Sequence, residues 1–259
     1  MKTFHSATAL AMVLTATMAP AQEAELPSLA RQGQGGIGER DWLVSEWDAG
    51  QSNILTWSAE NVRRENDGIT FVLDAAGPEA ERPFRGGEIQ SRTTARTGTW
   101  SWRTQAPEMV EGAVFGMFLY QADHENQPWR EYDIEFVGGD TTEIQINIHF
   151  ETEAGEHVSL DQANGGPVTV DLGFDAAEGL HDYAITVEED AAEFRVDGEV
   201  VGRYGPEDMP GNTWSPGPLR AFVDLWAVPP SMSDWAGTWA DPGRALTGRL
   251  TGVSLPPAD

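Results

Sequence analysis

The sequence predicts an all-β protein built as a sandwich of two antiparallel sheets. Many short segments alternate apolar and polar residues with the period of a β-strand. Glycine-rich turn signals separate these segments, and almost no stretch repeats its apolar residues with the period of a helix. A series of short strands with frequent turns favours two packed sheets over a helical or mixed architecture.

The expected strands follow one another from Trp42 towards the C-terminus. They cover residues 69–73, 88–92, 99–103, 113–120, 132–137, 143–150, 168–171, 182–188, 193–196, 199–202, 220–226 and 248–254. Turn signals lie between them at 66–68, 138–140, 164–166 and 197–198. Asp197-Gly198 predicts a hairpin most strongly, because Asp-Gly readily adopts the positive φ angles of a two-residue turn.

Three regions divide the chain. Residues 1–21 resemble a secretory signal peptide: Lys2 and His5 precede an apolar stretch at 7–18, which is too short to span a bilayer. Residues 22–40 are polar and Gly-rich, and we expect a flexible N-terminal segment. Residues 41–259 contain no internal repeat and no clear boundary, so we expect one domain. The mature protein is therefore predicted to work outside the cytoplasm, secreted or periplasmic.

The composition excludes several functions. The 259 residues carry a formal net charge of −26, and Lys2 is the only lysine. This charge disfavours nucleic acids and anionic membranes as partners. It also disfavours a highly acidic polysaccharide, unless a cluster of arginines offsets the field locally. The absence of cysteine excludes disulfides, thiolate zinc sites and a cysteine nucleophile.

The most informative segment is 130–136, in which three carboxylates alternate with three apolar residues. Successive side chains of a strand point to opposite faces, so Glu131, Asp133 and Glu135 would share one face. The apolar residues between them would then point into the core. Three like charges side by side repel one another, and such a cost is often retained at functional sites.

Paired carboxylates of this kind suit glycoside hydrolysis. In a retaining glycosidase two carboxyl groups lie about 5–5.5 Å apart. Residues four apart on a strand are separated by roughly 13 Å, a gap that leaning glutamate side chains can largely close. We assign Glu131 as nucleophile, Glu135 as general acid and then base, and Asp133 as a partner that modulates their protonation. The symmetry of the spacing leaves the order of the two glutamates open, and a solvated acidic strand without chemistry is the alternative.

Aromatic residues support a carbohydrate ligand, because indole rings stack on the apolar faces of sugars. The chain has ten tryptophans. Several lie in loops or beside the acidic strand: Trp129, Trp214, Trp226, Trp235 and Trp239. We expect Trp235 and Trp239 to be the more exposed of these, and Trp100 and Trp102 to lie in the core.

The segment Glu131-Tyr-Asp133-Ile-Glu135-Phe-Val-Gly-Gly-Asp-Thr-Thr-Glu-Ile-Gln-Ile-Asn147 resembles the signature of glycoside hydrolase family 16, most of all that of bacterial lichenases, the endo-β-1,3-1,4-glucanases. Further similar segments are 87–92, 97–103, 116–120, 128–129, 181–198, 225–226 and 234–235, so the resemblance covers most of the domain at 41–259. It implies a β-jelly-roll sandwich with an open substrate cleft across a concave sheet. It also implies that Glu131 is the nucleophile and Glu135 the acid/base.

The resemblance further implies a set of residues that line the cleft: Glu88, Phe118, Tyr120, Trp129, Asn147, Trp226 and Trp235. His149, two residues after Asn147, could face the same cleft. The Glu-x-Asp-x-Glu spacing disfavours the laminarinase-like and agarase-like branches, which usually carry one more residue. The chain departs from lichenases at three of its positions: Gln90 replaces a usual arginine, His149 a usual tyrosine and Asp224 a usual asparagine.

Together these features predict a secreted retaining endo-β-glucanase acting on mixed-linkage or a related β-glucan by double displacement. We expect no cofactor for catalysis, a polysaccharide as the partner and a monomeric protein. Relatives often hold a structural calcium ion, but the sequence identifies no metal ligands. Two alternatives stay open: a transglycosylase or exopolysaccharide-processing glycanase, and a non-catalytic carbohydrate-binding jelly roll. The paired Glu131 and Glu135 argue against the second, because a binding module does not need both.

Overall fold

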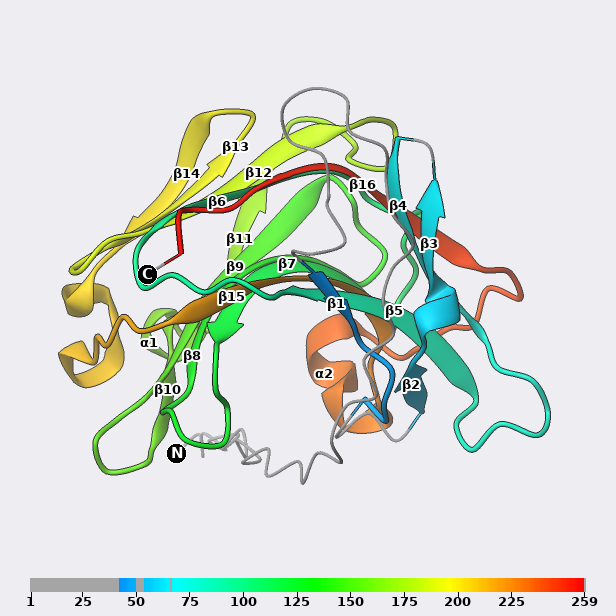
Figure 1. Ribbon diagram of the computed structural model, residues 1–259, viewed down its shortest axis with the longest axis horizontal. Coiled ribbons are helices and arrows are strands. Elements are labelled where there is room, and N and C mark those ends of the chain that lie inside the picture. The colour runs from blue at the N-terminus through cyan, green and yellow to red at the C-terminus, as the bar shows by residue number, and fades with distance from the viewer. Residues whose placement is uncertain (1–41, 50–53, 66, 259) are drawn as a thin grey trace, which may run out of the picture.

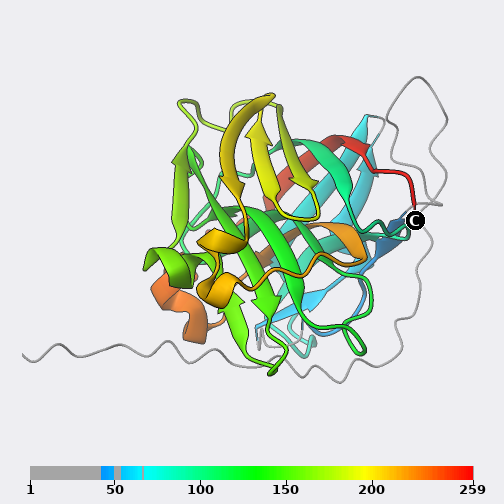
Figure 2. The same cartoon turned by 90° about the vertical axis from the view of Figure 1, so that its left-hand side faces the viewer.

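A computed structural model describes residues 42–49, 54–65 and 67–258. The predicted signal peptide at 1–21 and the segment at 22–40 lie outside the described residues. Two layers of strands lie one over the other (Figures 1 and 2). Within the described part of the chain, no helix has the length and apolar character needed to cross a membrane.

The inner sheet carries the acidic strand. Its order runs from β9 (Glu143–Glu151) through β8 (Arg130–Val137), β7 (Ala113–Gln121), β15 (Leu219–Ala227) and β5 (Phe84–Ser91) to β1 (Trp42–Val44). Two short strands, β10 (His157–Ser159) and β11 (Val168–Asp171), both pair with β9. All these pairs are antiparallel, and Figure 1 shows the sheet bowed with its concave face away from the other layer.

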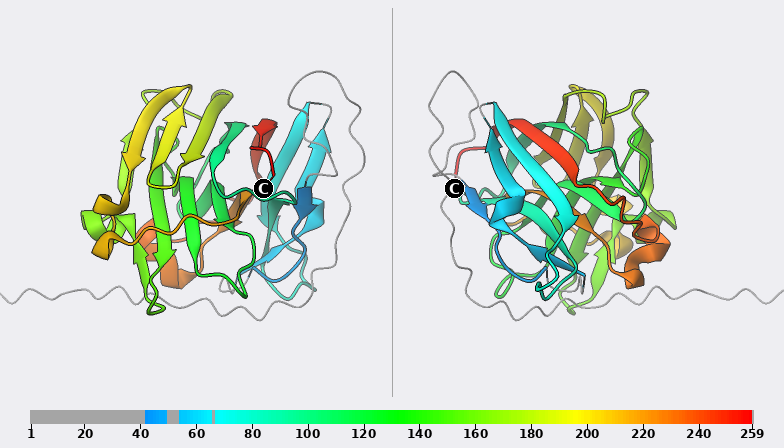
Figure 3. Two further views of the ribbon diagram at one scale, coloured as in Figure 1. Left: turned by 60° about the vertical axis from the view of Figure 1, so that its left-hand side comes forward. Right: turned by 90° about the vertical axis from the view of Figure 1, so that its right-hand side faces the viewer.

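The outer sheet covers the opposite face of this layer. Its strands, in spatial order, are β3 (Val62–Glu65), β4 (Gly68–Ala75), β16 (Leu246–Ser254), β6 (Gly98–Gln105), β12 (His181–Val187), β13 (Ala192–Val196) and β14 (Glu199–Tyr204). The last residues of β4 pair with the first of β5 and so join the two sheets. The short β2 (Leu55–Trp57) runs parallel to β5. Figure 3 shows both layers from two further sides.

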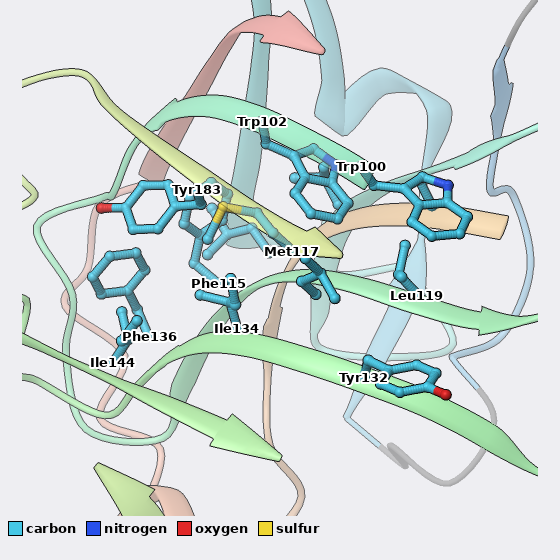
Figure 4. Packing of buried hydrophobic residues seen from close by; sticks show 14 of the residues in the cluster. Trp100, Trp102, Phe115, Met117, Leu119, Tyr132, Ile134, Phe136, Ile144 and Tyr183 are labelled. Carbon is cyan, nitrogen blue, oxygen red and sulfur yellow. The ribbon is translucent and has the colours of Figure 1, made fainter. Parts of the chain in front are cut away.

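Between the layers lies one large apolar core, which holds Trp100 and Trp102 at 1% exposure each, as predicted. Figure 4 shows side chains from both sheets meeting there, among them Phe115 and Tyr183. Because alternate residues of every inner strand enter this core, the residues between them must face the concave side.

Each predicted strand is present, with ends that differ by no more than four residues. The predicted hairpin at Asp197-Gly198 joins β13 to β14, and both residues have positive φ (48° and 84°). The expected two-sheet antiparallel fold is thus confirmed. Among the described residues, the elements that the sequence patterns did not predict are short. They are β1, β2, β3, β10, two α-helices and four 3-10 helices, namely α1 (Leu160–Asn164), α2 (Ser233–Ala236), η2 (Ala59–Asn61), η3 (Pro206–Asp208), η4 (Pro210–Asn212) and η5 (Pro230–Met232).

Candidate active site

Strand β8 divides its side chains between the core and the concave face. Tyr132, Ile134 and Phe136 are fully buried in the core, as the alternation predicts, and Figure 4 labels all three there. Glu131, Asp133 and Glu135 therefore share the concave face. Asp133 is 4% exposed, and the two glutamates are half-buried.

Strand pairing places each carboxylate of β8 between one residue of β7 and one residue of β9, and these three residues form a row across the sheet. From β7 through β8 to β9 the rows are Tyr120–Glu131–His149, Phe118–Asp133–Asn147 and Gly116–Glu135–Gln145. Of the residues that the resemblance placed in the cleft, Phe118, Tyr120, Asn147 and His149 thus lie directly beside the acidic strand.

Glu131 has a specific partner. Nε1 of Trp129 donates a hydrogen bond of 2.6 Å to Oε2 of Glu131. Burial raises the pKa of Glu131 to about 7, and the hydrogen bond from Trp129 opposes that rise because it favours the charged form. The indole ring is itself held by two stacked imidazoles, those of His157 at 4.4 Å and His149 at 5.5 Å between ring centroids.

The surroundings of Glu135 favour its protonated form more than those of Glu131 do. Burial raises its pKa to about 8, and the charge of Glu131 adds to the rise. Among the described residues, no side-chain or backbone group donates a hydrogen bond to its carboxyl group. Glu131 has such a donor and Glu135 does not, so Glu131 ionises first and Glu135 keeps its proton.

Asp133, between them, is the most enclosed of the three. Burial raises its pKa well above the usual range, and the neighbouring charges of Glu131 and Glu135 raise it further. Oδ2 of Asp133 lies 3.4 Å from Nε2 of His149. A neutral Asp133 therefore separates the two glutamates while it still offers an O–H for hydrogen bonding.

A second pair of carboxyl groups, those of Asp224 and Glu88, lies on the two strands beyond β7. Asp224 on β15 is opposite Glu88 on β5 and opposite Gly116 on β7. The backbone N–H of Gly116 donates a hydrogen bond of 3.2 Å to Oδ1 of Asp224. A Cβ atom at Gly116 would lie 2.8 Å from that oxygen, so any larger residue here would force the Asp224 side chain to shift. Because Glu135 is opposite Gly116 on the other side, Asp224 and Glu135 flank the same empty position.

Both members of this pair favour the protonated form. Burial raises the pKa of Glu88 to about 7, although Ser45 Oγ donates a hydrogen bond to its carboxylate. Burial also raises the pKa of Asp224 well above its usual range, and the charges of Glu88 and Glu135 act in the same direction. Sequence reasoning noted Asp224 as a departure from lichenases but did not place it in the site.

Aromatic side chains extend the face on both sides of the carboxylates. Phe118 stacks on Phe222 with ring centroids 4.9 Å apart, and Tyr120 meets the same ring edge-on at 6.0 Å. The ring centroids of Trp226 and Trp235 lie 6.3 Å apart, and Nε1 of Trp235 donates a hydrogen bond of 2.9 Å to Oε1 of Gln145. All these rings are half-buried.

The other two candidate tryptophans lie elsewhere. Trp214 packs against Tyr132 and Phe150, which both belong to the core. Trp239 packs edge-on against Phe84 with ring centroids 5.2 Å apart. Trp235 and Trp239 are half-buried, as Trp214 is, and both pack against neighbouring apolar side chains.

A pair of histidines borders the site at β9 and β10. Nδ1 of His149 lies 2.8 Å from Nε2 of His157. Burial lowers the pKa of His149 to about 4, helped by His157, so the imidazole is neutral near pH 7. Burial also lowers the pKa of His157. Beside them the backbone N–H of Asp161 donates a hydrogen bond of 3.2 Å to Asn147 Oδ1, which fixes that amide. His157 and Asp161 were not predicted from the sequence as neighbours of the site.

Metal binding finds no support in the geometry. Across the described ranges of the chain, no group of three or more His, Asp or Glu side chains is placed to hold a metal ion.

Comparison with known proteins places this site in a family. Residues 49–243 match the glycosyl hydrolases family 16. A beta-glucanase of Acetivibrio thermocellus is 28% identical over 234 residues, which are 89% of this chain but 64% of that protein. The chain thus spans less than two thirds of that relative. A beta-glucanase of Brevibacillus brevis is 31% identical, with 78% of this chain and 71% of that protein covered.

Solved structures agree with the fold. The Bacillus licheniformis beta-glucanase superposes with a TM-score of 0.68 at 25% identity, over 87% of this chain and 94% of that one. This similarity confirms the jelly-roll sandwich that the resemblance implied. The matches to most of the domain show that the chain belongs to glycosyl hydrolase family 16, which confirms the predicted family and its enzyme class, the glycoside hydrolases of the endo-glucanase type.

Proposed function

We propose that this protein is a secreted, retaining endo-β-glucanase that hydrolyses β-1,3-1,4 or a related β-glucan. The observation that carries the proposal is the set of three carboxylates on one face of β8, with Trp129 bonded to the first of them. Relatives named beta-glucanases support the substrate class. Secretion rests on the signal-like residues 1–21, and a monomer is the expected state.

The glucan would lie across the strands of the concave face. Trp129, Trp226 and Trp235 would offer ring faces to the sugars, and Phe118 and Tyr120 would add apolar surface beside the acidic strand. Polar side chains would contact the sugar hydroxyls, namely Glu88, Asn147 and His149. These assignments place the bond to be cleaved over Glu131 and Glu135.

The first chemical step forms a covalent intermediate. A carboxylate oxygen of Glu131 attacks the anomeric carbon while Glu135 donates its proton to the glycosidic oxygen. The bond between these two sugar atoms breaks, and the released half of the chain leaves as an alcohol. The hydrogen bond from Trp129 helps because it keeps Glu131 ionised inside a buried cluster.

The second step restores the enzyme. Glu135, now ionised, takes a proton from a water molecule, and the hydroxyl oxygen attacks the anomeric carbon. The ester bond to Glu131 breaks, and the sugar leaves with its original anomeric configuration. Asp133, held neutral by burial and by its neighbours, adds no further negative charge between the two glutamates.

The test is hydrolysis of mixed-linkage glucan by the full chain and by Glu131→Gln. The variant should lose more than about a thousandfold in rate, because it removes the nucleophile while it keeps the shape of the side chain. Thermal unfolding checks that the fold is retained, and Glu199→Gln, an exposed glutamate on β14, is the matched control. Undiminished hydrolysis by Glu131→Gln would defeat the proposal, as would saturable glucan binding without release of reducing ends by the unaltered protein.

A further inference from the structure

A positively charged side chain lies on the otherwise acidic concave face. On β15, Ala221, Val223 and Leu225 are fully buried in the core, so Arg220 and Phe222 face the concave side. Arg220 is opposite Tyr120 on β7, which is in turn opposite Glu131 on β8. Arg220 therefore lies in the same row as the proposed nucleophile, two strands away. At the usual strand spacing the two backbones are about 10 Å apart.

The guanidinium of Arg220 has only part of its hydrogen bonding satisfied by protein. NH1 donates a hydrogen bond of 3.2 Å to Oε1 of Gln90. Nε is buried and has no hydrogen-bond partner among the described residues. Within the same part of the chain, no carboxylate lies within 4.0 Å of Arg220, and Asp123 acts on it only at longer range. A half-buried cation of this kind lacks a counter-ion.

A second arginine lies next to it. Gln90 is opposite Phe222, so residue 92, just beyond the end of β5, comes beside Arg220 in the same register. Burial lowers the pKa of Arg220, and the positive charge of Arg92 lowers it further. Nε of Arg92 donates a hydrogen bond of 3.2 Å to the carbonyl of Trp42 and is thereby held at this edge.

A half-buried cation without a counter-ion among the described residues, such as Arg220, is costly unless an anion binds beside it. The rest of the face is acidic, with five buried or half-buried carboxyl groups: Glu88, Glu131, Asp133, Glu135 and Asp224. An anionic ligand would be repelled over these groups and attracted over Arg220. Because Arg220 lies two strands away from Glu131, its ligand would be another part of the same substrate chain.

We propose that Arg220 forms a subsite for a carboxylate carried by the glucan, as on a uronic acid or an acidic substituent. The proposal rests on the proposed function and narrows its substrate to an acidic β-glucan. A planar guanidinium binds a carboxylate through two parallel N–H donors, and Gln90 leaves such an edge available because it occupies only NH1.

The test compares two polymers that differ only in charge. One is mixed-linkage glucan, and the other is the same glucan with part of its C6 hydroxymethyl groups oxidised to carboxylates. Affinity is measured by calorimetry in a Glu131→Gln background, so that binding is read without cleavage. Arg220→Gln removes the charge, Arg220→Lys keeps it without the planar fork, and Arg249→Gln on β16 of the outer sheet, where Arg249 pairs with Asp67, is the control.

The expected readout is the ratio of affinities for the oxidised and the neutral polymer. Arg220→Gln should lower this ratio about tenfold, the usual effect of losing a hydrogen bond to a charged group. Arg220→Lys should lower it less, Arg249→Gln should leave it unchanged, and raising the salt concentration should shrink the difference. A ratio that changes less than twofold in Arg220→Gln overturns the subsite, and so does an equal loss of affinity for both polymers. Hydrolysis of neutral glucan by the unaltered protein tests the proposed function separately.

Discussion

The indole Nε1 of Trp129 lies 2.6 Å from Oε2 of Glu131 and donates a hydrogen bond to it. An indole is a donor only, so the contact favours the ionised carboxylate over the protonated acid. Trp129 thus links the aromatic surface that would bind a sugar with the side chain that would attack it. The first prediction follows from this pair.

Trp129→Phe should move the acidic limb of the pH profile of kcat/KM to higher pH. The phenyl ring can still stack on His149 and His157, but the pKa of Glu131 rises once its donor is lost. A hydrogen bond to a charged group contributes roughly 1.5–3 kcal/mol, which corresponds to a shift of about one to two pH units. The matched control is Trp214→Phe, whose Nε1 is buried and has no partner among the described residues. An unmoved limb in Trp129→Phe would show that the hydrogen bond does not set the ionisation of Glu131.

Gly116→Ala should destabilise the protein and lower kcat/KM. The new Cβ atom would lie 2.8 Å from Oδ1 of Asp224 and displace that carboxyl group. Overpacking of this size costs about 1–3 kcal/mol. A double-mutant cycle with Asp224→Ala, measured by thermal unfolding, should show that the loss shrinks when the carboxyl group is absent. Additive losses would mean that the two positions do not compete for space.

Glu88→Gln should stabilise the protein at alkaline pH. Burial raises the pKa of Glu88 from 4.5 to about 7, so the folded state binds a proton more tightly than the unfolded chain does. The stability of the unaltered protein therefore falls as pH rises from about 4.5 to 7, by at most about 3 kcal/mol from this group. The gain in Glu88→Gln should be present at pH 8 and vanish near pH 4. Denaturant unfolding at both pH values measures it, with Glu199→Gln as the exposed control.

His149→Tyr should change the stability of the protein at acidic pH. Burial lowers the pKa of His149 from 6.5 to about 4, so the unfolded chain binds the proton more tightly than the folded protein. The stability of the unaltered protein therefore falls as pH drops from about 6.5 to 4. Relative to it, His149→Tyr should gain up to about 3 kcal/mol between pH 7 and pH 4, although it loses the bond to His157 at every pH. A stability difference that is independent of pH would contradict the neutral state of His149.

Local periodicity was sufficient to predict the long strands and the core. Residues such as Tyr132 and Ile134 repeat with a period of two over eight residues, and the physics of the pleat then fixes which side chains are buried. The same pattern predicted that Glu131 and Glu135 share a face. Strands of three or four residues, such as β1 and β10, are too short for alternation to distinguish them from loops.

Contacts between distant strands could not be predicted in the same way. Asp224 meets Gly116 across 108 residues, and Arg220 meets Gln90 across 130, because the register of β15 against β7 and β5 brings them together. That register depends on the packing of the whole sheet, so the residues of one strand alone do not reveal it. The neighbours of the acidic strand therefore required the structure, whereas the acidic strand itself did not.

The most direct test of the central claim is to trap the covalent intermediate. A mixed-linkage oligosaccharide with fluorine at C2 and a dinitrophenyl leaving group should form the glycosyl ester faster than water removes it. Mass spectrometry of the digested protein should then find the sugar on Glu131. A sugar attached to Glu135 would contradict the assignment of the two glutamates, and glucan hydrolysis without any trapped ester would contradict double displacement.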